Sequence, residues 1–140
     1  MINNQRLTDQ LIIHEGLKLK PYRCTSNKLT IGVGRNIEDV GITEAEARYL
    51  LQNDIARVAG ECTRVFEWFL EAPEMVKEAV INLVFNMGLS KFLQFKKTIA
   101  HLENQEYSLA GAELLNSRYA EQVGNRAIEV ANQIGDCQKN

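Results

Sequence analysis

The first quarter of the chain changes from a helical to an alternating pattern of apolar residues. Over residues 4–14 the apolar positions recur at a helical spacing, which predicts a short amphipathic helix. Gly16 follows directly and is expected to end this helix. Over residues 17–35 apolar and polar residues alternate on either side of a polar Cys-Thr-Ser-Asn-Lys turn. A period of two interrupted by a polar turn predicts a small antiparallel hairpin or a three-stranded sheet.

The rest of the chain has the three-to-four-residue spacing of helices. Thr43 is followed three residues later by Glu46, which forms the capping box typical of a helix N-terminus and predicts a helix through about residue 60. The most continuously apolar stripe ends at Gly88 and is expected to form the central helix of a larger lobe. Further helices are predicted beyond it, the last over about residues 125–134.

These elements predict an α+β fold in one domain, since 140 residues are enough for a single hydrophobic core. We expect a small β lobe over about residues 15–42 and a connecting helix over about 43–60. A helical lobe is expected over about 61–136, with the N-terminal helix packed on it.

Composition and charge exclude several classes of protein. Apolar residues make up 45% of the chain and charged residues 24%, as in ordinary globular proteins. A net charge of −2 gives no general electrostatic reason to expect nucleic acid or an anionic membrane as partner. Residues 14–35, however, hold five basic residues against one glutamate. This local excess could favour an anionic polymer, or it could be a solvated edge that resists aggregation.

Cysteine usage and hydropathy bear on the compartment. Three cysteines are an odd number without metal-like spacing, which predicts free thiols in a reducing environment. No run of about 18 apolar residues is present, so no transmembrane helix is expected. The first ten residues lack the pattern of a secretory signal. A substrate outside the cytoplasm would therefore require another component to release the protein.

Other motifs give no sign of a metal or a cofactor. Gly32 and Gly34 could allow a ligand to approach the backbone closely or could mark a bulge. They do not form a dinucleotide motif, because Ile37 stands where a third glycine is required. His14 and His101 are far apart and lack partners at metal-binding spacing. We expect neither a metal nor an organic cofactor.

Glu15, at the end of the first predicted helix, is the leading candidate for chemistry. Cleavage of a glycosidic bond needs a proton for the leaving oxygen, and a carboxyl group supplies one near neutral pH when desolvation raises its pKa. A negative charge is disfavoured at a helix C-terminus, which favours a functional reason for this residue. The alternative is an exposed glutamate that merely ends a helix.

A second functional group is expected across the hairpin. Hydrolysis by two carboxylates needs a second acid, but the next acidic residue after Glu15 is Glu38. Cys24 and Thr30 are the polar groups available instead. A thiol near cations is partly ionised and could replace a carboxylate, while the hydroxyl positions a water molecule. Alternatively, Cys24 is a small buried hydrophobic residue.

Residues 14–34 resemble the catalytic region of the phage-type lysozymes, the muramidases of glycoside hydrolase family 24 that tailed phages use as endolysins. The family signature is Glu, eight residues, Asp or in some members Cys, five residues, Thr. Glu15, Cys24 and Thr30 meet this spacing. The similarity extends in the same order to three further segments, at residues 42–54, 81–88 and 117–127.

The resemblance implies a lysozyme-like fold and cleavage of the β-1,4 bond between N-acetylmuramic acid and N-acetylglucosamine in bacterial peptidoglycan, which lyses the cell. It implies that Glu15 is the general acid and that Cys24 and Thr30 hold and activate water. Substrate-binding positions are implied at Phe85, Asn86, Thr98, Gln122 and Arg126, of which Arg126 matches the arginine facing the catalytic glutamate.

The resemblance also implies a monomer made in the host cytoplasm and released to the cell wall with the help of a holin, without nucleic acid or membrane insertion. Two residues depart from the family pattern. Cys24 replaces the usual aspartate, and Arg35 stands where many members have histidine, so an ion pair there must be built differently.

Two alternative functions stay open on the sequence. With one carboxylate, Glu15 could serve as the acid/base of a lytic transglycosylase, which forms an anhydro ring without water. The second alternative is an inactive phage module that binds peptidoglycan and has lost its aspartate.

Overall fold

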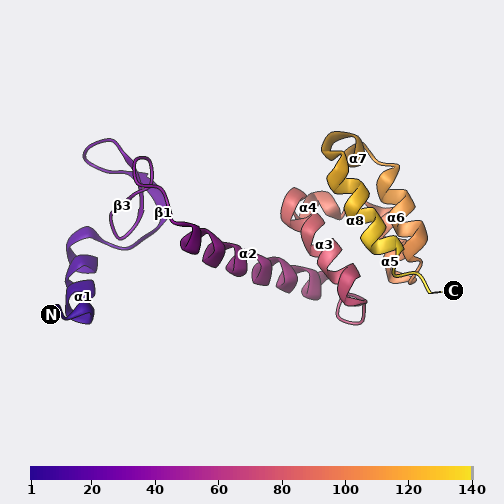
Figure 1. Cartoon of the computed structure of the whole chain (residues 1–140), viewed down its shortest axis with the longest axis horizontal. Coiled ribbons are helices and arrows are strands. Elements are labelled where there is room, and N and C mark those ends of the chain that lie inside the picture. Colours follow the sequence, from indigo (N-terminus) through magenta and orange to yellow (C-terminus); the bar gives the residue numbers. More distant parts are fainter. Residues whose placement is uncertain (140) are drawn as a thin grey trace. The chain divides into compact units, whose positions relative to one another are not determined.

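The secondary structure follows the predicted order: one helix, a small sheet, and then helices to the end of the chain. The computed structural model describes residues 1–139. The chain divides into two units, Met1–Tyr49 and Leu50–Asn140, the first carrying the sheet and the second consisting of helices (Figure 1). The predicted α+β fold class is therefore confirmed.

Helix α1 spans Asn4–Glu15 and delivers Glu15 as its last residue. The side chain of Asn3 accepts a hydrogen bond from the backbone N–H of Arg6 at 2.9 Å, which satisfies one of the free donors at the helix start. At the other end, Gly16 adopts a positive φ of 80° and donates its N–H to the carbonyl of Ile12 at 2.8 Å. Glycine adopts this conformation without steric cost, so the helix ends where the sequence predicts.

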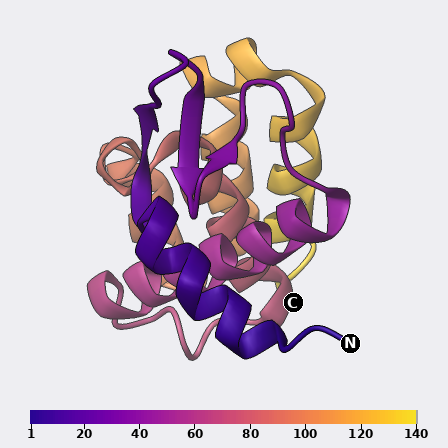
Figure 2. The same cartoon turned by 90° about the vertical axis from the view of Figure 1, so that its left-hand side faces the viewer.

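The sheet of the N-terminal unit is antiparallel, with strand order β1-β2-β3. Thr30 lies in the central strand, opposite Tyr22 on one side and Asn36 on the other. The turn between the first two strands is closed by the N–H of Cys24, which donates to the Lys28 carbonyl at 3.0 Å. Figure 2 shows the strands side by side next to α1; they are β1 (Lys18–Arg23), β2 (Leu29–Gly32) and β3 (Arg35–Asn36).

Helix α2 spans Glu44–Val65 and begins with the predicted capping box. The N–H of Glu46 donates to Thr43 Oγ1 at 3.1 Å, and the N–H of Thr43 donates to Glu46 Oε1 at 2.9 Å. The helix runs five residues beyond the predicted end because Gly60 is accommodated inside it. Its buried residues, Val58 and Cys62, lie in its C-terminal half.

The core of the C-terminal unit is built around α3, the helix predicted from the continuous apolar stripe. Five of its residues are buried, and Gly88 ends it with a φ of 85°. The helices of this unit after α2 are α3 (Glu74–Met87), α4 (Leu89–Phe92), α5 (Lys96–Glu103), α6 (Tyr107–Leu115), α7 (Arg118–Val123) and α8 (Asn125–Gly135).

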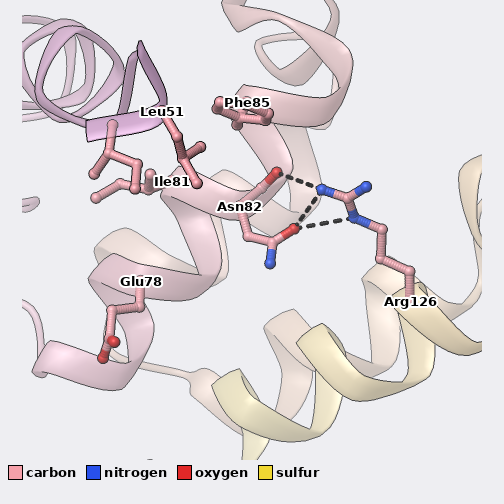
Figure 3. Close-up of a pocket in the computed structure, with 7 residues that line it drawn as sticks. Leu51, Glu78, Ile81, Asn82, Phe85 and Arg126 are labelled. Carbon is pink, nitrogen blue, oxygen red and sulfur yellow. Dashed lines mark hydrogen bonds between the residues drawn. The ribbon is translucent and has the colours of Figure 1, made fainter. Parts of the chain in front are cut away.

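Helix α8 packs closely on α6 and also contacts α3. At the α6 contact a methyl group on Gly111 would approach the carbonyl oxygen of Ala131 to 2.6 Å, so only glycine fits there. Because α8 is held in this position, its first turn, which carries Arg126, lies beside α3 (Figure 3).

In residues 1–139 no helix is both long and apolar enough to cross a membrane.

Candidate functional site

The carboxylate of Glu15 lies against the backbone of Gly34, the glycine that precedes β3. A methyl group on Gly34 would come within 2.9 Å of Glu15 Oε2 and 3.3 Å of its Cδ. Gly34 also has a φ of 64°, which disfavours any other residue. The space beside Gly34 is therefore occupied by the protein's own Glu15, a role that the sequence did not suggest for this glycine. Within its own unit the Glu15 side chain is exposed.

Cys24 and Thr30 lie together in the sheet's first hairpin. Thr30 is 3% exposed, and its hydroxyl donates to the carbonyl of Lys28 at 2.8 Å. Hydrogen bonds from the backbone of Lys28 and Ser26, and a further one with the Thr30 side chain, lower the pKa of the Cys24 thiol. Cys24 is half-buried rather than buried, so it is not the inert hydrophobic residue that the sequence allowed as an alternative.

Arg35 pairs with Glu46, a contact that the sequence did not predict. Its Nη1 and Nη2 donate to the two carboxylate oxygens of Glu46 at 3.0 and 2.8 Å, and Nη1 also donates to the Gly41 carbonyl at 3.0 Å. The arginine lowers the pKa of Glu46 to about 2. This bidentate ion pair connects β3 to the start of α2. Its arginine, Arg35, directly follows Gly34.

A pocket of about 340 Å³ opens in the C-terminal unit, on the exposed face of α3. Apolar side chains form one part of its wall and polar side chains the other (Figure 3). Phe85, one of the implied substrate-binding residues, is 44% exposed at its edge. The lining residues are Leu51, Ile55, Glu78, Ile81, Asn82, Phe85 and Arg126.

Arg126 reaches from α8 to Asn82 on α3 (Figure 3). Its Nε and Nη2 donate to Asn82 Oδ1 at 3.0 and 2.8 Å, and Nη2 lies 3.4 Å from the Asn82 carbonyl oxygen. The guanidinium is thereby fixed in orientation at the pocket wall. Asn82 lines this pocket and was not singled out from the sequence, although it lies one helical turn before Asn86.

Asn86, another implied substrate-binding residue, has a partner on α7. The hydroxyl of Tyr119 donates to Asn86 Oδ1 at 2.8 Å. Tyr119 is 4% exposed, and burial raises its pKa, while the charge of Arg126 acts in the opposite direction. The hydroxyl therefore stays protonated and remains a donor.

The remaining implied residues, Thr98 and Gln122, lie apart from this pocket. Gln122 is exposed on α7. Thr98 is 2% exposed in α5 and lines a second cavity, of about 310 Å³, together with Lys96, Lys97 and Ser117. The structure therefore brings together Phe85 and Arg126, and it places Thr98 on another surface of the same unit.

Metal chemistry has no candidate site among residues 1–139, where no three His, Cys, Asp or Glu side chains cluster at ligating distance.

A helix that ends in an acidic residue beside a small antiparallel sheet, followed by helices to the end of the chain, is the fold of the lysozyme-like glycoside hydrolases. The chain belongs to the phage lysozyme family, whose model matches residues 13–130. Proteins of this family degrade peptidoglycan, and the chain is such an enzyme.

Three relatives illustrate the similarity. The endolysin of Acyrthosiphon pisum secondary endosymbiont phage 1 is 34% identical over 119 residues, which cover 81% of this chain and 77% of the relative. The probable T4-type lysozyme 1 of Dictyostelium discoideum is 27% identical over 157 residues, covering 91% and 92%. The SAR-endolysin of Bacteriophage PS34 is 30% identical over 82 residues, covering 56% and 48%.

Proposed function

We propose that this chain hydrolyses the β-1,4 bond between N-acetylmuramic acid and N-acetylglucosamine in peptidoglycan and so lyses bacterial cells, with Glu15 as the general acid. The observation that carries this proposal is the position of the Glu15 carboxylate, at the end of α1 and against the Gly34 backbone. Membership of the phage lysozyme family supports the reaction class.

In the proposed reaction Glu15 donates a proton to the glycosidic oxygen as the bond to the anomeric carbon breaks. A water molecule adds to that carbon and loses a proton to the Cys24 thiolate, whose lowered pKa supports the role of base. The Thr30 hydroxyl donates to the Lys28 carbonyl or, when Cys24 is ionised, to its sulfur, and in either case its oxygen can accept a hydrogen bond from the water. Solvent then carries the proton from Cys24 to Glu15, which restores both groups, while the leaving sugar keeps the proton that Glu15 donated.

We assign substrate binding to the C-terminal unit. Phe85 offers an exposed aromatic face and Arg126 a fixed guanidinium at the pocket, while Asn86 offers an oriented amide. Thr98 and Gln122 are proposed to contact more distant parts of the polymer.

Similarity to a phage endolysin supports a cellular role in which the chain is made in the host cytoplasm, acts as a monomer and reaches the cell wall after a holin-like partner opens the membrane.

The test combines substitution with product analysis. Glu15→Gln removes the acidic proton and should reduce clearing of a cell-wall suspension by at least about 100-fold, the usual contribution of a general acid. In a second arm, Cys24→Asp should retain turnover and Cys24→Ala should lower it sharply. Substantial clearing by Glu15→Gln would contradict the assignment.

The second candidate function is a lytic transglycosylase, favoured by the absence of any acidic residue between Glu15 and Glu38. Mass spectrometry of the released muropeptides distinguishes the two reactions, since reducing ends and anhydro ends differ by one water. We expect reducing ends. Binding to cell walls without any product would instead indicate an inactive binding module.

A further inference from the structure

Two asparagines on α3 have their amide oxygens occupied by residues from distant parts of the chain. Asn82 and Asn86 are four residues apart, so their side chains share one face of the helix. Oδ1 of Asn82 accepts hydrogen bonds from Arg126, and Oδ1 of Asn86 accepts one from Tyr119. Both asparagines are exposed.

The amide nitrogens of the same two side chains are left open. A primary amide has one accepting oxygen and an NH₂ group with two donor hydrogens. Among residues 1–139, no side-chain or backbone group accepts a hydrogen bond from either NH₂. Figure 3 shows the Asn82 nitrogen directed away from the Arg126 guanidinium. With both NH₂ groups open, this face of α3 offers donors to a ligand at both positions, while Asn82 Oδ1 already accepts two hydrogen bonds and Asn86 Oδ1 one.

The Tyr119 side chain is held firmly in the position from which it orients Asn86. Its ring is buried and packs edge-on against Phe95, with the ring centroids 6.3 Å apart and the planes at 84°. A buried hydroxyl is costly without a partner, and Asn86 supplies that partner. In the flipped orientation the Asn86 NH₂ would donate to the Tyr119 oxygen, and the buried hydroxyl hydrogen would then lose its acceptor. The pair therefore favours the orientation in which Asn86 Oδ1 accepts.

We propose that Tyr119 is a positioning residue that fixes the amide of Asn86 so that α3 recognises acceptor groups of the cell-wall polymer, specifically amide carbonyls. The inference rests on the proposed function, because it concerns the same substrate. A flipped Asn86 would present its oxygen and select hydroxyl donors instead. The NH₂ groups of Asn82 and Asn86 lie one helical turn apart, with about 5–6 Å between the Cβ atoms of the two residues. This spacing suits two successive carbonyl groups along the cell-wall polymer.

The direct test is Tyr119→Phe, which removes the hydroxyl and keeps the ring. Releasing the Asn86 amide should raise KM about fivefold, the worth of one net hydrogen bond, and leave kcat within about twofold. Binding to cell walls is measured in parallel in a Glu15→Gln background, so this readout does not need turnover. If wild-type protein released no product but the binding effect persisted, the proposed function would fail and the positioning role would stand.

A double-mutant cycle separates positioning from a structural effect. If Tyr119 acts through Asn86, then Tyr119→Phe should have no further effect on KM in an Asn86→Ala background. Asn86→Asp keeps an acceptor for Tyr119 but loses the donor, so it should bind cell walls as weakly as Asn86→Ala. Additive effects of Tyr119→Phe and Asn86→Ala, or wild-type affinity of Asn86→Asp, would overturn the proposal.

Tyr107→Phe is the matched control, since Tyr107 is also buried at 7% exposure and lies on α6. It should leave KM unchanged; an equal rise in KM for both tyrosines would mean that the effect is structural and would overturn the proposal.

The carbonyl could belong to the N-acetyl groups of the sugars or to the stem peptides. Two modified polymers distinguish these sources: glycan freed of peptides by an amidase, and glycan from which the N-acetyl groups have been removed. The affinity difference between Asn86 and Asn86→Ala proteins should vanish on the polymer that lacks the carbonyl recognised. An unchanged difference on both polymers would rule out recognition of amide carbonyls.

Discussion

At the scale of single residues, the contact between Glu15 and Gly34 is the most consequential one in the N-terminal unit. The two residues are separated by the whole of the first hairpin, yet the carboxylate lies on the glycine backbone. Any side chain at position 34 would displace the proposed acid, and the positive φ adds a conformational cost.

We therefore predict different outcomes for two alanine substitutions. Gly34→Ala and Gly32→Ala both place a Cβ at a positive φ, 64° and 73°, and each should cost about 1–2 kcal/mol of stability. Only the first meets Glu15; nothing lies within 4 Å of the second. Clearing rates at a temperature well below both unfolding midpoints should fall at least about tenfold further for Gly34→Ala. Equal losses for the two variants would show that the Glu15 contact has no role.

The cysteines show how far residue type alone can be interpreted. The sequence left Cys24 as either a reactive thiol or a buried hydrophobic residue, and the structure assigns the second description to Cys62. Cys62 is fully buried, and desolvation raises its pKa to about 11, whereas the pKa of Cys24 is lowered. Composition could not distinguish them, because the pKa depends on the backbone groups around each sulfur.

At the scale of elements, long periodic segments were predicted well and short ones were not. Helix α3 and the capping box at Thr43 are where the sequence places them. Helix α7 was not predicted, because six residues are too few to show a helical period. The single helix expected from Ser90 through Leu102 is divided into α4 and α5. The α7 start does carry a local signal, since the Ser117 hydroxyl accepts from the Ala120 N–H at 3.3 Å.

The Arg35–Glu46 pair shows one residue serving two elements. Glu46 was predicted as part of the capping box, and its carboxylate also accepts two hydrogen bonds from the guanidinium of Arg35. Arg35 stands where many family members have histidine, so an ion pair built differently was expected at this position. The Arg35–Glu46 pair is that ion pair. Its partner could not be predicted, because Glu46 is one of several acids within reach in sequence.

The pH dependence of stability should report this ion pair. Glu46 has a folded-state pKa of about 2 against an ordinary value of 4.5, so its contribution to stability is present above about pH 4.5 and is lost as the pH falls to about 2. The difference in thermal midpoint between wild type and Glu46→Gln should therefore be constant above pH 4.5 and disappear near pH 2. Glu44→Gln, which affects an exposed pair with Arg48, is the control and should give a small difference at every pH. A Glu46→Gln difference that persists at pH 2 would contradict this reading.

At the scale of the whole molecule, charge is distributed unevenly. The N-terminal unit carries seven basic and six acidic residues, and the C-terminal unit nine and twelve. The basic excess expected over residues 14–35 is reduced in the structure by acidic residues that follow it. Arg23 lies 3.3 Å from Glu38, and Lys28 lies 3.5 Å from Glu38 and 3.4 Å from Asp39.

Removing these two acids should strengthen attraction to an anionic polymer. We predict that Glu38→Gln combined with Asp39→Asn raises the affinity for purified cell walls at low salt, because Arg23 and Lys28 lose their partners. The gain should vanish toward about 1 M salt, where the Debye length is about 3 Å. Sedimentation with cell walls across a salt series, in the Glu15→Gln background, measures it. A gain that does not depend on salt would show that the effect is not electrostatic.

The sequence by itself determined the features that depend on neighbours along the chain: the fold class, the helix that ends at Glu15, the hairpin bearing Cys24 and Thr30, and the family. Helical periods, turn residues and caps act within a few positions, so they can be recognised without coordinates. Only the tertiary structure decided which amide atoms the proposed substrate-binding face of α3 presents. Tyr119 and Asn86 are 33 residues apart, and Arg126 and Asn82 are 44 apart. An amide presents its oxygen or its nitrogen according to the group that contacts it. That group is set by α8, which packs on α3, and by α7, which contacts α8 and carries Tyr119.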